Sequence, residues 1–183
     1  MIQFTYNPKK ATQAASYLLG RSGRRMNYTK LIKILCLADR EALRRFDQPI
    51  TTDAPFSMDN GPILSHIYNH IKVKEERGPY WLNLIDRKGY DVALKKRAPI
   101  GELSPCELEI IDEIFQQFGH MEVWDLVAYC HKNLPEWTDP EGSSIPISFE
   151  KILKAAGRSW KEIEKIQKET KSFESIQSLL SVE

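Results

Sequence analysis

The feature that most constrains this chain is a helical segment that is apolar on nearly every side. Residues 28–46 follow Asn27, a residue type that caps helix N-termini well. Apolar side chains fill most of the first half, around Leu31, Leu35 and Ala38, whereas charged side chains concentrate in the second half. A helix that is apolar all round is surrounded by protein. The segment is therefore predicted to be the central helix of a folded core.

Helical periodicity and end signals predict further helices on both sides of this segment. The sequences that begin at Ser104 and Ser159 are capping boxes, which mark helix N-termini. Pro62 follows an Asn-Gly turn signal, and proline suits the first turn of a helix. The predicted helices cover residues 8–21, 62–74, 105–119, 123–132, 148–156 and the chain from 160 onward.

Short strands complete the predicted fold. Residues 80–85 and 90–94 form a hairpin pattern around a loop that contains Gly89, and residues 55–58 read as another strand. A lone hairpin is marginal in water, so it is expected to dock on the helices or to pair with the 55–58 strand. The expected fold class is α+β, a predominantly α-helical single domain with a small antiparallel β-hairpin or three-stranded sheet.

Residues 1–160 are expected to form the domain, and residues 161–183 a C-terminal helix that packs on the body or contacts a partner. Apolar residues make up 42% and charged residues 28% of the chain, an ordinary globular mixture. The N-terminus lacks a signal-peptide pattern, and no apolar run approaches the roughly 20 residues of a membrane helix. A cytoplasmic protein without membrane contact is expected. The scattered cysteines suggest no disulfide framework.

Few residue patterns support catalysis. His66 and His70 lie one helical turn apart and could face one metal ion, as in a metal-dependent hydrolase. Ile67, however, occupies the position where the zinc-protease helix carries its glutamate. Cys130 and His131 are adjacent on a helix and point in different directions, so they form no dyad. No catalytic residue, metal ligand or cofactor is predicted.

Three stretches together resemble a known family. Residues 30–41 (KLIKILCLADRE) are similar to a "KLxKLLYLAD" helix, and residues 49–63 to a "PIT … GPV" block. Residues 103–137 are similar to an "LSxxE … weLxxlsH" segment that ends in "xPxW". In this order and spacing they resemble the Panacea-domain family of SocA-like antitoxins and phage-associated proteins. The motif residues expected to define the fold are Leu35, Ala38, Asp39, Gly61, Pro62, Trp124 and His131.

The resemblance implies an antitoxin without enzymatic activity that binds and neutralises a cognate protein toxin encoded by a neighbouring gene. An alternative within the family is an adaptor that delivers the toxin to a Clp protease. A net charge of +1 and the lack of a recognition-helix motif argue against nucleic acid as a partner. Because arginine and aromatic residues are enriched in protein interfaces, the predicted contacts are the basic and aromatic residues Arg40, Arg44, Lys95, Arg97 and Trp160.

Overall fold

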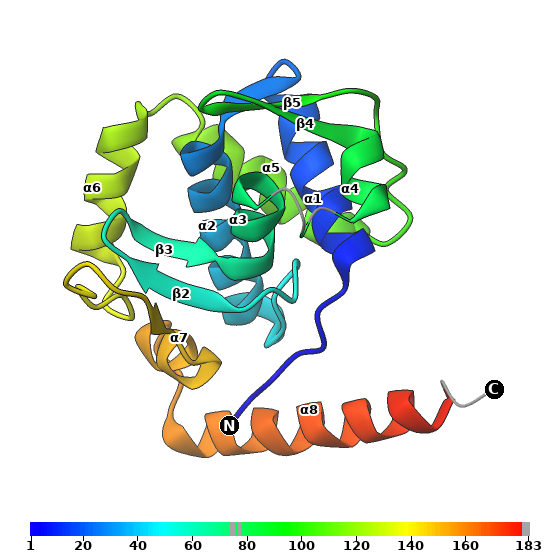
Figure 1. Cartoon of the computed structure of the whole chain (residues 1–183). Helices are drawn as coiled ribbons and strands as arrows, with labels where there is room; N and C mark the ends of the chain where they lie inside the picture. Colours follow the sequence, from blue (N-terminus) through cyan, green and yellow to red (C-terminus); the bar gives the residue numbers. More distant parts are fainter. Residues whose placement is uncertain (74–75, 77, 181–183) are drawn as a thin grey trace.

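The computed structural model describes residues 1–73, 76 and 78–180, the side chains of 174–180 excepted. At its centre lies α2 (Tyr28–Phe46), as Figure 1 shows. Asn27 caps the helix by accepting a hydrogen bond from the backbone N–H of Thr29 at 2.9 Å. Four consecutive residues, 32–35, are buried, so every side of this stretch of the helix is enclosed. The prediction of an enclosed central helix is confirmed.

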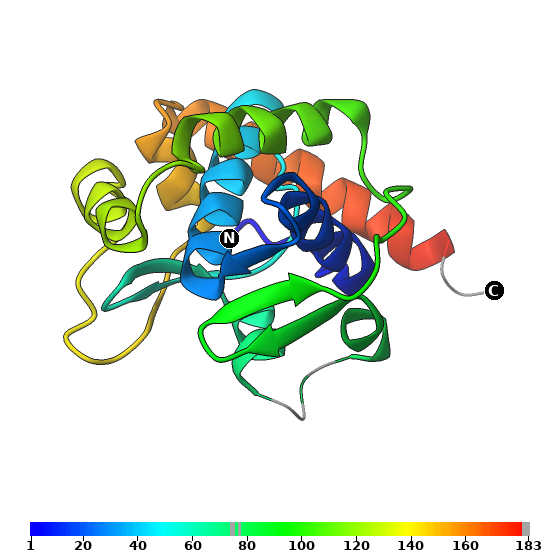
Figure 2. The ribbon, with the colours of Figure 1, turned by 90° about the horizontal axis from the view of Figure 1, so that it is seen from above.

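Helices surround α2 and form the main core. They are α1 (Pro8–Arg21), α5 (Pro105–Phe118) and α6 (Val123–Asn133), and each of them contacts α2. The capping box of α5 is present, with the Ser104 and Glu107 side chains each accepting from the other residue's backbone N–H. Seen from above in Figure 2, α5 and the sheet formed by β1, β5 and β4 lie on opposite sides of α1 and α2. The predicted fold class, an α+β and mostly helical domain, is confirmed.

The first sheet has the order β1–β5–β4 and is antiparallel throughout. It comprises β1 (Arg25–Asn27), β4 (Ile85–Lys88) and β5 (Asp91–Leu94). The predicted hairpin is therefore correct for its second half, but residues 79–84 form the short helix α4 (Pro79–Leu84) and not a strand. Trp81 and Leu84, three residues apart, are both buried by this helical turn. The third strand of this sheet is β1, which follows α1 in the chain and pairs with β5. Residues 55–58 do not belong to this sheet.

The second sheet has the order β3–β2–β6 and comprises β2 (Pro55–Met58), β3 (Gly61–Leu64) and β6 (Ile145–Pro146). The prediction that Pro62 begins a helix is wrong, because Asp59 and Asn60 form the turn of a β2–β3 hairpin. Proline is tolerated there because β3 is an edge strand. Helix α3 (Ser65–Lys72) starts only after β3.

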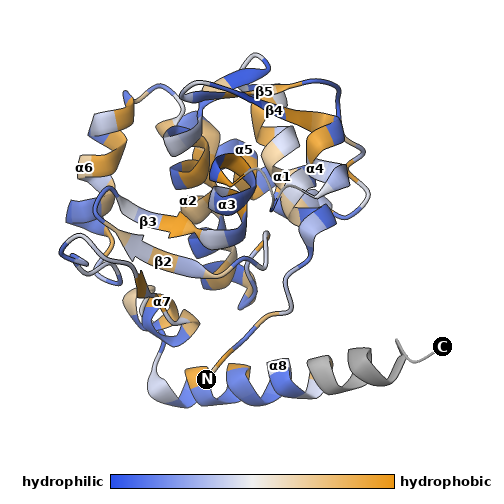
Figure 3. Ribbon diagram, viewed as in Figure 1, coloured by the Kyte–Doolittle hydropathy of each residue, from blue (hydrophilic) through white to orange (hydrophobic). Residues whose placement is uncertain are grey.

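The last helices form a smaller second core. Helices α7 (Phe149–Ala155) and α8 (Trp160–Leu180) pack on each other, and α8 runs along the base of the molecule beside the N-terminal segment in Figure 1. The second core combines Ile2 and Leu43 with Ile147, Phe149, Ile152, Leu153, Ile163 and Ile166. Figure 3 shows the polar side of α8 turned outward. Among the described residues, no helix has both the length and the hydropathy required to cross a membrane.

Candidate partner-binding site

Asp39 fastens the loop that follows α2 to that helix. Its carboxylate accepts a hydrogen bond from the backbone N–H of Thr51 at 2.9 Å, and its second oxygen accepts one from the Thr51 hydroxyl. Burial raises the pKa of Asp39 to about 7, although the bonds from Thr51 partly oppose the rise. The side chain thus has a structural role: it fixes residues 47–54 relative to the central helix.

Asp53 holds the start of α3 through hydrogen bonds in a similar way. This fully buried carboxylate accepts from the backbone N–H groups of His66 at 3.0 Å and Ile67 at 2.9 Å, and so caps the helix. It also lies 2.8 Å from His66 Nδ1, and this hydrogen bond raises the pKa of His66. The Tyr6 ring stacks on the His66 ring with centroids 4.0 Å apart.

The two histidines considered as metal ligands are therefore engaged elsewhere. His66 Nδ1 is bonded to Asp53, and His70 uses its ring nitrogens with the Tyr6 hydroxyl at 3.2 Å and the Glu76 carbonyl at 2.7 Å. In the described part of the chain, no group of three or more histidine, cysteine or acidic side chains could hold a metal ion. This arrangement ties the N-terminal segment to α3.

Two of the three cysteines, Cys36 and Cys130, lie inside the fold, whereas Cys106 is exposed. Cys130 is completely buried, and burial raises the pKa of its thiol to about 11. Burial likewise raises the pKa of Cys36 well above its ordinary value. Because the thiolate is the reactive species, a raised pKa disfavours a nucleophilic role for these two thiols.

Arg40, one of the predicted partner contacts, forms an ion pair within the molecule. Its Nε donates to the Glu136 carboxylate at 2.7 Å, and Glu136 is 4% exposed. The arginine therefore neutralises a buried acid in the loop after α6. This ion pair could not be predicted from the sequence, because the two residues are 96 positions apart.

The other predicted contacts fall into two separate groups. Arg44 and Trp160 lie at the α2–α8 end of the molecule, where Arg44 pairs with Glu41 at 2.7 Å and Trp160 is 60% exposed. Lys95 and Arg97 follow β5 at the opposite end in Figure 1, and Lys95 Nζ donates to the Leu82 carbonyl at 2.7 Å. The structure therefore does not bring the predicted set together on one surface.

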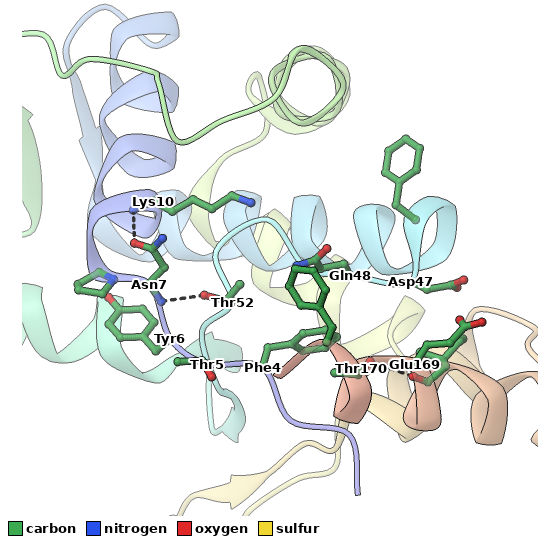
Figure 4. Close-up of a pocket in the computed structure, with 14 residues that line it drawn as sticks. Phe4, Thr5, Tyr6, Asn7, Lys10, Asp47, Gln48, Thr52, Glu169 and Thr170 are labelled. Atoms are coloured by element: carbon green, nitrogen blue, oxygen red, sulfur yellow. Dashed lines mark hydrogen bonds between the residues drawn. The ribbon is translucent and has the colours of Figure 1, made fainter. Parts of the chain in front are cut away.

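A groove lies beside the first of these groups. It has a volume of about 660 Å³ and runs between residues 4–8, the end of α2 with the following loop, and α8. Figure 4 shows its walls, with Phe4 and Asn7 on one side and Glu169 and Thr170 on α8. Asn7 fixes the N-terminal wall, since its backbone N–H donates to the Thr52 hydroxyl at 2.9 Å.

The groove combines exposed aromatic rings with charges that already have partners. Phe46 at the end of α2 is 52% exposed and Phe173 on α8 is 57% exposed, and both line it. Lys10 pairs with Glu107 at 2.6 Å, and Asp47 pairs with Arg158 at 2.6 Å. The groove therefore offers two exposed aromatic rings, a residue type enriched in protein interfaces, among polar side chains.

Sequence reasoning missed both phenylalanines because each continues the apolar pattern of its helix. A signal was nevertheless present in the chain. Phe46 directly follows the charged residues Arg44 and Arg45, and Phe173 directly follows a polar stretch. Aromatic residues that directly follow polar stretches of a helix are candidates for partner contacts.

Most of the motif residues lie inside the fold. Leu35 and Ala38 are buried in the main core, and Asp39 holds the α2–β2 loop. Gly61 adopts a left-handed conformation with φ of 88° at the end of the β2–β3 turn. The His131 ring stacks on Trp137 with centroids 4.1 Å apart. Trp124 differs: it lies on α6 and is 67% exposed.

The family model described as antitoxin SocA-like, Panacea domain, matches residues 31–138, more than half of the chain. The chain belongs to this family. The matched Panacea region begins in α2 and ends in the loop after α6, so it contains both sheets' hairpins and the Arg40–Glu136 ion pair. The groove, by contrast, is formed largely by residues outside the match, on the N-terminal segment and α8. No curated protein and no solved structure matches the chain.

Proposed function

We propose that this Panacea-domain protein is an antitoxin that neutralises a cognate protein toxin by binding it directly in the cytoplasm. The observation that carries the proposal is the family match over residues 31–138. The engaged histidines and the high pKa values of Cys36 and Cys130 favour a binding role over an enzymatic one. The toxin is expected to be encoded by a neighbouring gene.

We further propose that the toxin covers the groove between the N-terminal segment and α8. Phe46 and Phe173 supply exposed aromatic surface within it, and Trp160 lies on the same helix as Phe173. Aromatic side chains with adjacent arginines, here Arg44, are the residue types that dominate binding energy in interfaces. Because the groove lies mainly outside the family match, it can differ between members that recognise different toxins.

The experiment is co-expression of the chain with the adjacent open reading frame, followed by a growth assay and affinity purification. The neighbour is expected to arrest growth alone, and to be harmless and co-purify when the antitoxin is present. A double Phe46→Ser, Phe173→Ser variant should lose both rescue and co-purification. Trp124→Ser is the matched control, because it removes an aromatic ring of similar exposure on another helix.

Other outcomes contradict parts of the proposal in distinguishable ways. Rescue without co-purification that depends on a Clp protease would replace sequestration by the adaptor mechanism. Loss of binding in Trp124→Ser, with the groove variant unaffected, would move the interface to α6. A neighbour that is neither toxic nor bound would refute the antitoxin function itself.

A further inference from the structure

Lys33 is a buried lysine whose charge has no acidic partner in the described structure. Its side chain is 1% exposed, and Nζ donates to the Pro62 carbonyl at 2.6 Å. None of the described carboxylates forms an ion pair with it. An ammonium has more N–H donors than this one neutral acceptor can satisfy. Burial of an unpaired charge is strongly unfavourable, so a position of this kind points to a function.

A small pocket opens directly beside Lys33. It lies between the first turns of α2, the β2–β3 turn and α3, and has a volume of about 160 Å³. Tyr28, Asn60, Tyr68 and Lys72 line it together with Lys33. An apolar cavity of roughly 150 Å³ is large enough for benzene, so the pocket can hold the body of a small molecule. We call it the Lys33 pocket.

The charges around the Lys33 pocket favour an anion. Lys72 Nζ donates to the Tyr28 hydroxyl at 2.9 Å, and the Arg87 guanidinium lies 5.3 Å from the centre of the Tyr28 ring. Neither cation forms an ion pair with a described carboxylate. Asp59 is the acid that lines the pocket, and its carboxylate accepts from the Gly142 N–H at 3.0 Å. Two lysines therefore face one carboxylate here, with a third cation nearby.

A further polar atom lies close to Lys33. His131 Nε2 is buried and has no hydrogen-bond partner among the described residues. A Cβ placed on Gly61 would lie 3.2 Å from Lys33 Nζ and 3.4 Å from His131 Nε2, so glycine keeps the space beside both nitrogens open. Lys33, Gly61 and His131 come from the three separate stretches that carry the family resemblance. The fold thus brings one position from each of these three stretches to the same point.

We propose that the Lys33 pocket binds a small organic anion, a phosphate or carboxylate group carried on a compact apolar body. The spare N–H groups of Lys33 and the ammonium of Lys72 bind the anionic oxygens. Ile32 and Ile63 line the same pocket and contact the apolar part. The site shares no lining residue with the toxin groove, so its test is independent of the test of the antitoxin proposal.

The test is an NMR titration of the ¹⁵N-labelled full chain with phenyl phosphate, benzoate and inorganic phosphate at constant ionic strength. Saturable chemical-shift changes are expected at the backbone amides of Tyr28, Asn60 and Tyr68. Lys33→Met should weaken binding by about tenfold or more, the effect of removing one charge-assisted interaction. Lys30→Met is the matched control, because Lys30 lies on the same helix and does not line the pocket. Tighter binding of phenyl phosphate than of benzoate would assign the ligand as a phosphate, and the reverse order as a carboxylate.

Two results would overturn the proposal. One is the absence of saturable shifts at the pocket with all three anions. The other is equal binding by the wild type and Lys33→Met. Lys72 is exposed at the pocket rim, and Lys72→Met therefore provides a second variant whose folding is not in doubt. It should weaken binding by roughly threefold or more, in line with a solvent-exposed charge, and unchanged affinity would count against the site.

Discussion

The Lys33→Met variant exchanges a buried ammonium for a neutral side chain of similar length, and we expect it to stabilise the protein. Removing an ion from water costs several kcal/mol in a folded protein, taken as about 4 kcal/mol for this enclosed group. The variant also loses the hydrogen bond to the Pro62 carbonyl, a charge-assisted bond worth roughly 1.5–3 kcal/mol. Cys36 Sγ, 3.6 Å from the same oxygen, remains as a weak donor. The difference is a gain of about 1–2.5 kcal/mol in unfolding free energy, or roughly 2–10 °C in Tm.

The pH dependence of this gain provides the sharper assay. Burial lowers the pKa of Lys33. Between that value and the ordinary lysine pKa of about 10.4, the unfolded chain binds more protons than the folded one, so wild-type stability rises with pH across this interval. Urea unfolding followed by circular dichroism at about pH 7 and pH 10 should therefore show the advantage of Lys33→Met shrinking at the higher pH.

Two outcomes would refute this reasoning. A variant less stable than the wild type by about 1 kcal/mol or more at neutral pH would mean that the bond to Pro62 outweighs the desolvation of the ammonium. An advantage that is independent of pH would mean that relief of packing strain, and not of charge burial, explains the gain. Lys30→Met, the control on the same helix, should change the unfolding free energy by less than about 0.5 kcal/mol.

Three further predictions concern the fold and the groove. Arg40→Ala leaves Glu136 buried without its partner, and should destabilise the protein by about 3 kcal/mol in urea unfolding; adding Glu136→Gln should recover part of that loss. Burial raises the pKa of Asp39 to about 7, so the folded state retains a proton that the unfolded state releases above about pH 4, and stability falls as the pH rises through this window. Asp39→Asn should remove that dependence, and parallel stability–pH curves for variant and wild type would contradict it. Phe46→Ser should weaken toxin binding by about tenfold or more in calorimetry, whereas Trp124→Ser should leave it unchanged.

The local part of the fold follows directly from the sequence. The central helix, the capping box at Ser104 and the turn around Gly89 depend on side-chain periodicity and on hydrogen bonds between residues a few positions apart. Such interactions are encoded within one segment, which is why these elements were predicted with nearly their observed bounds. The resemblance to the Panacea family also depended on the order of local motifs, and the family match confirms it.

The errors arise where local signals are ambiguous. Pro62 after an Asn-Gly turn suits a helix start as well as an edge strand, and pairing of β3 with β2 decided between them. Trp81 and Leu84 lie in an aromatic-aliphatic run that is typical of a strand, but a helical turn buries both side chains against the core. In each case the outcome depended on which distant surface was available for packing.

By itself, the sequence determined most of the helices, the caps at Asn27 and Ser104, the enclosed centre of the fold and the family to which the chain belongs. Only the tertiary structure decided that Arg40 neutralises Glu136, that Lys33 is buried without an acid, and that Phe46 and Phe173 share a groove. The physical reason is separation along the chain: helix formation depends on neighbours within one or two turns, whereas the environment of a charge or an exposed ring depends on every element that packs around it.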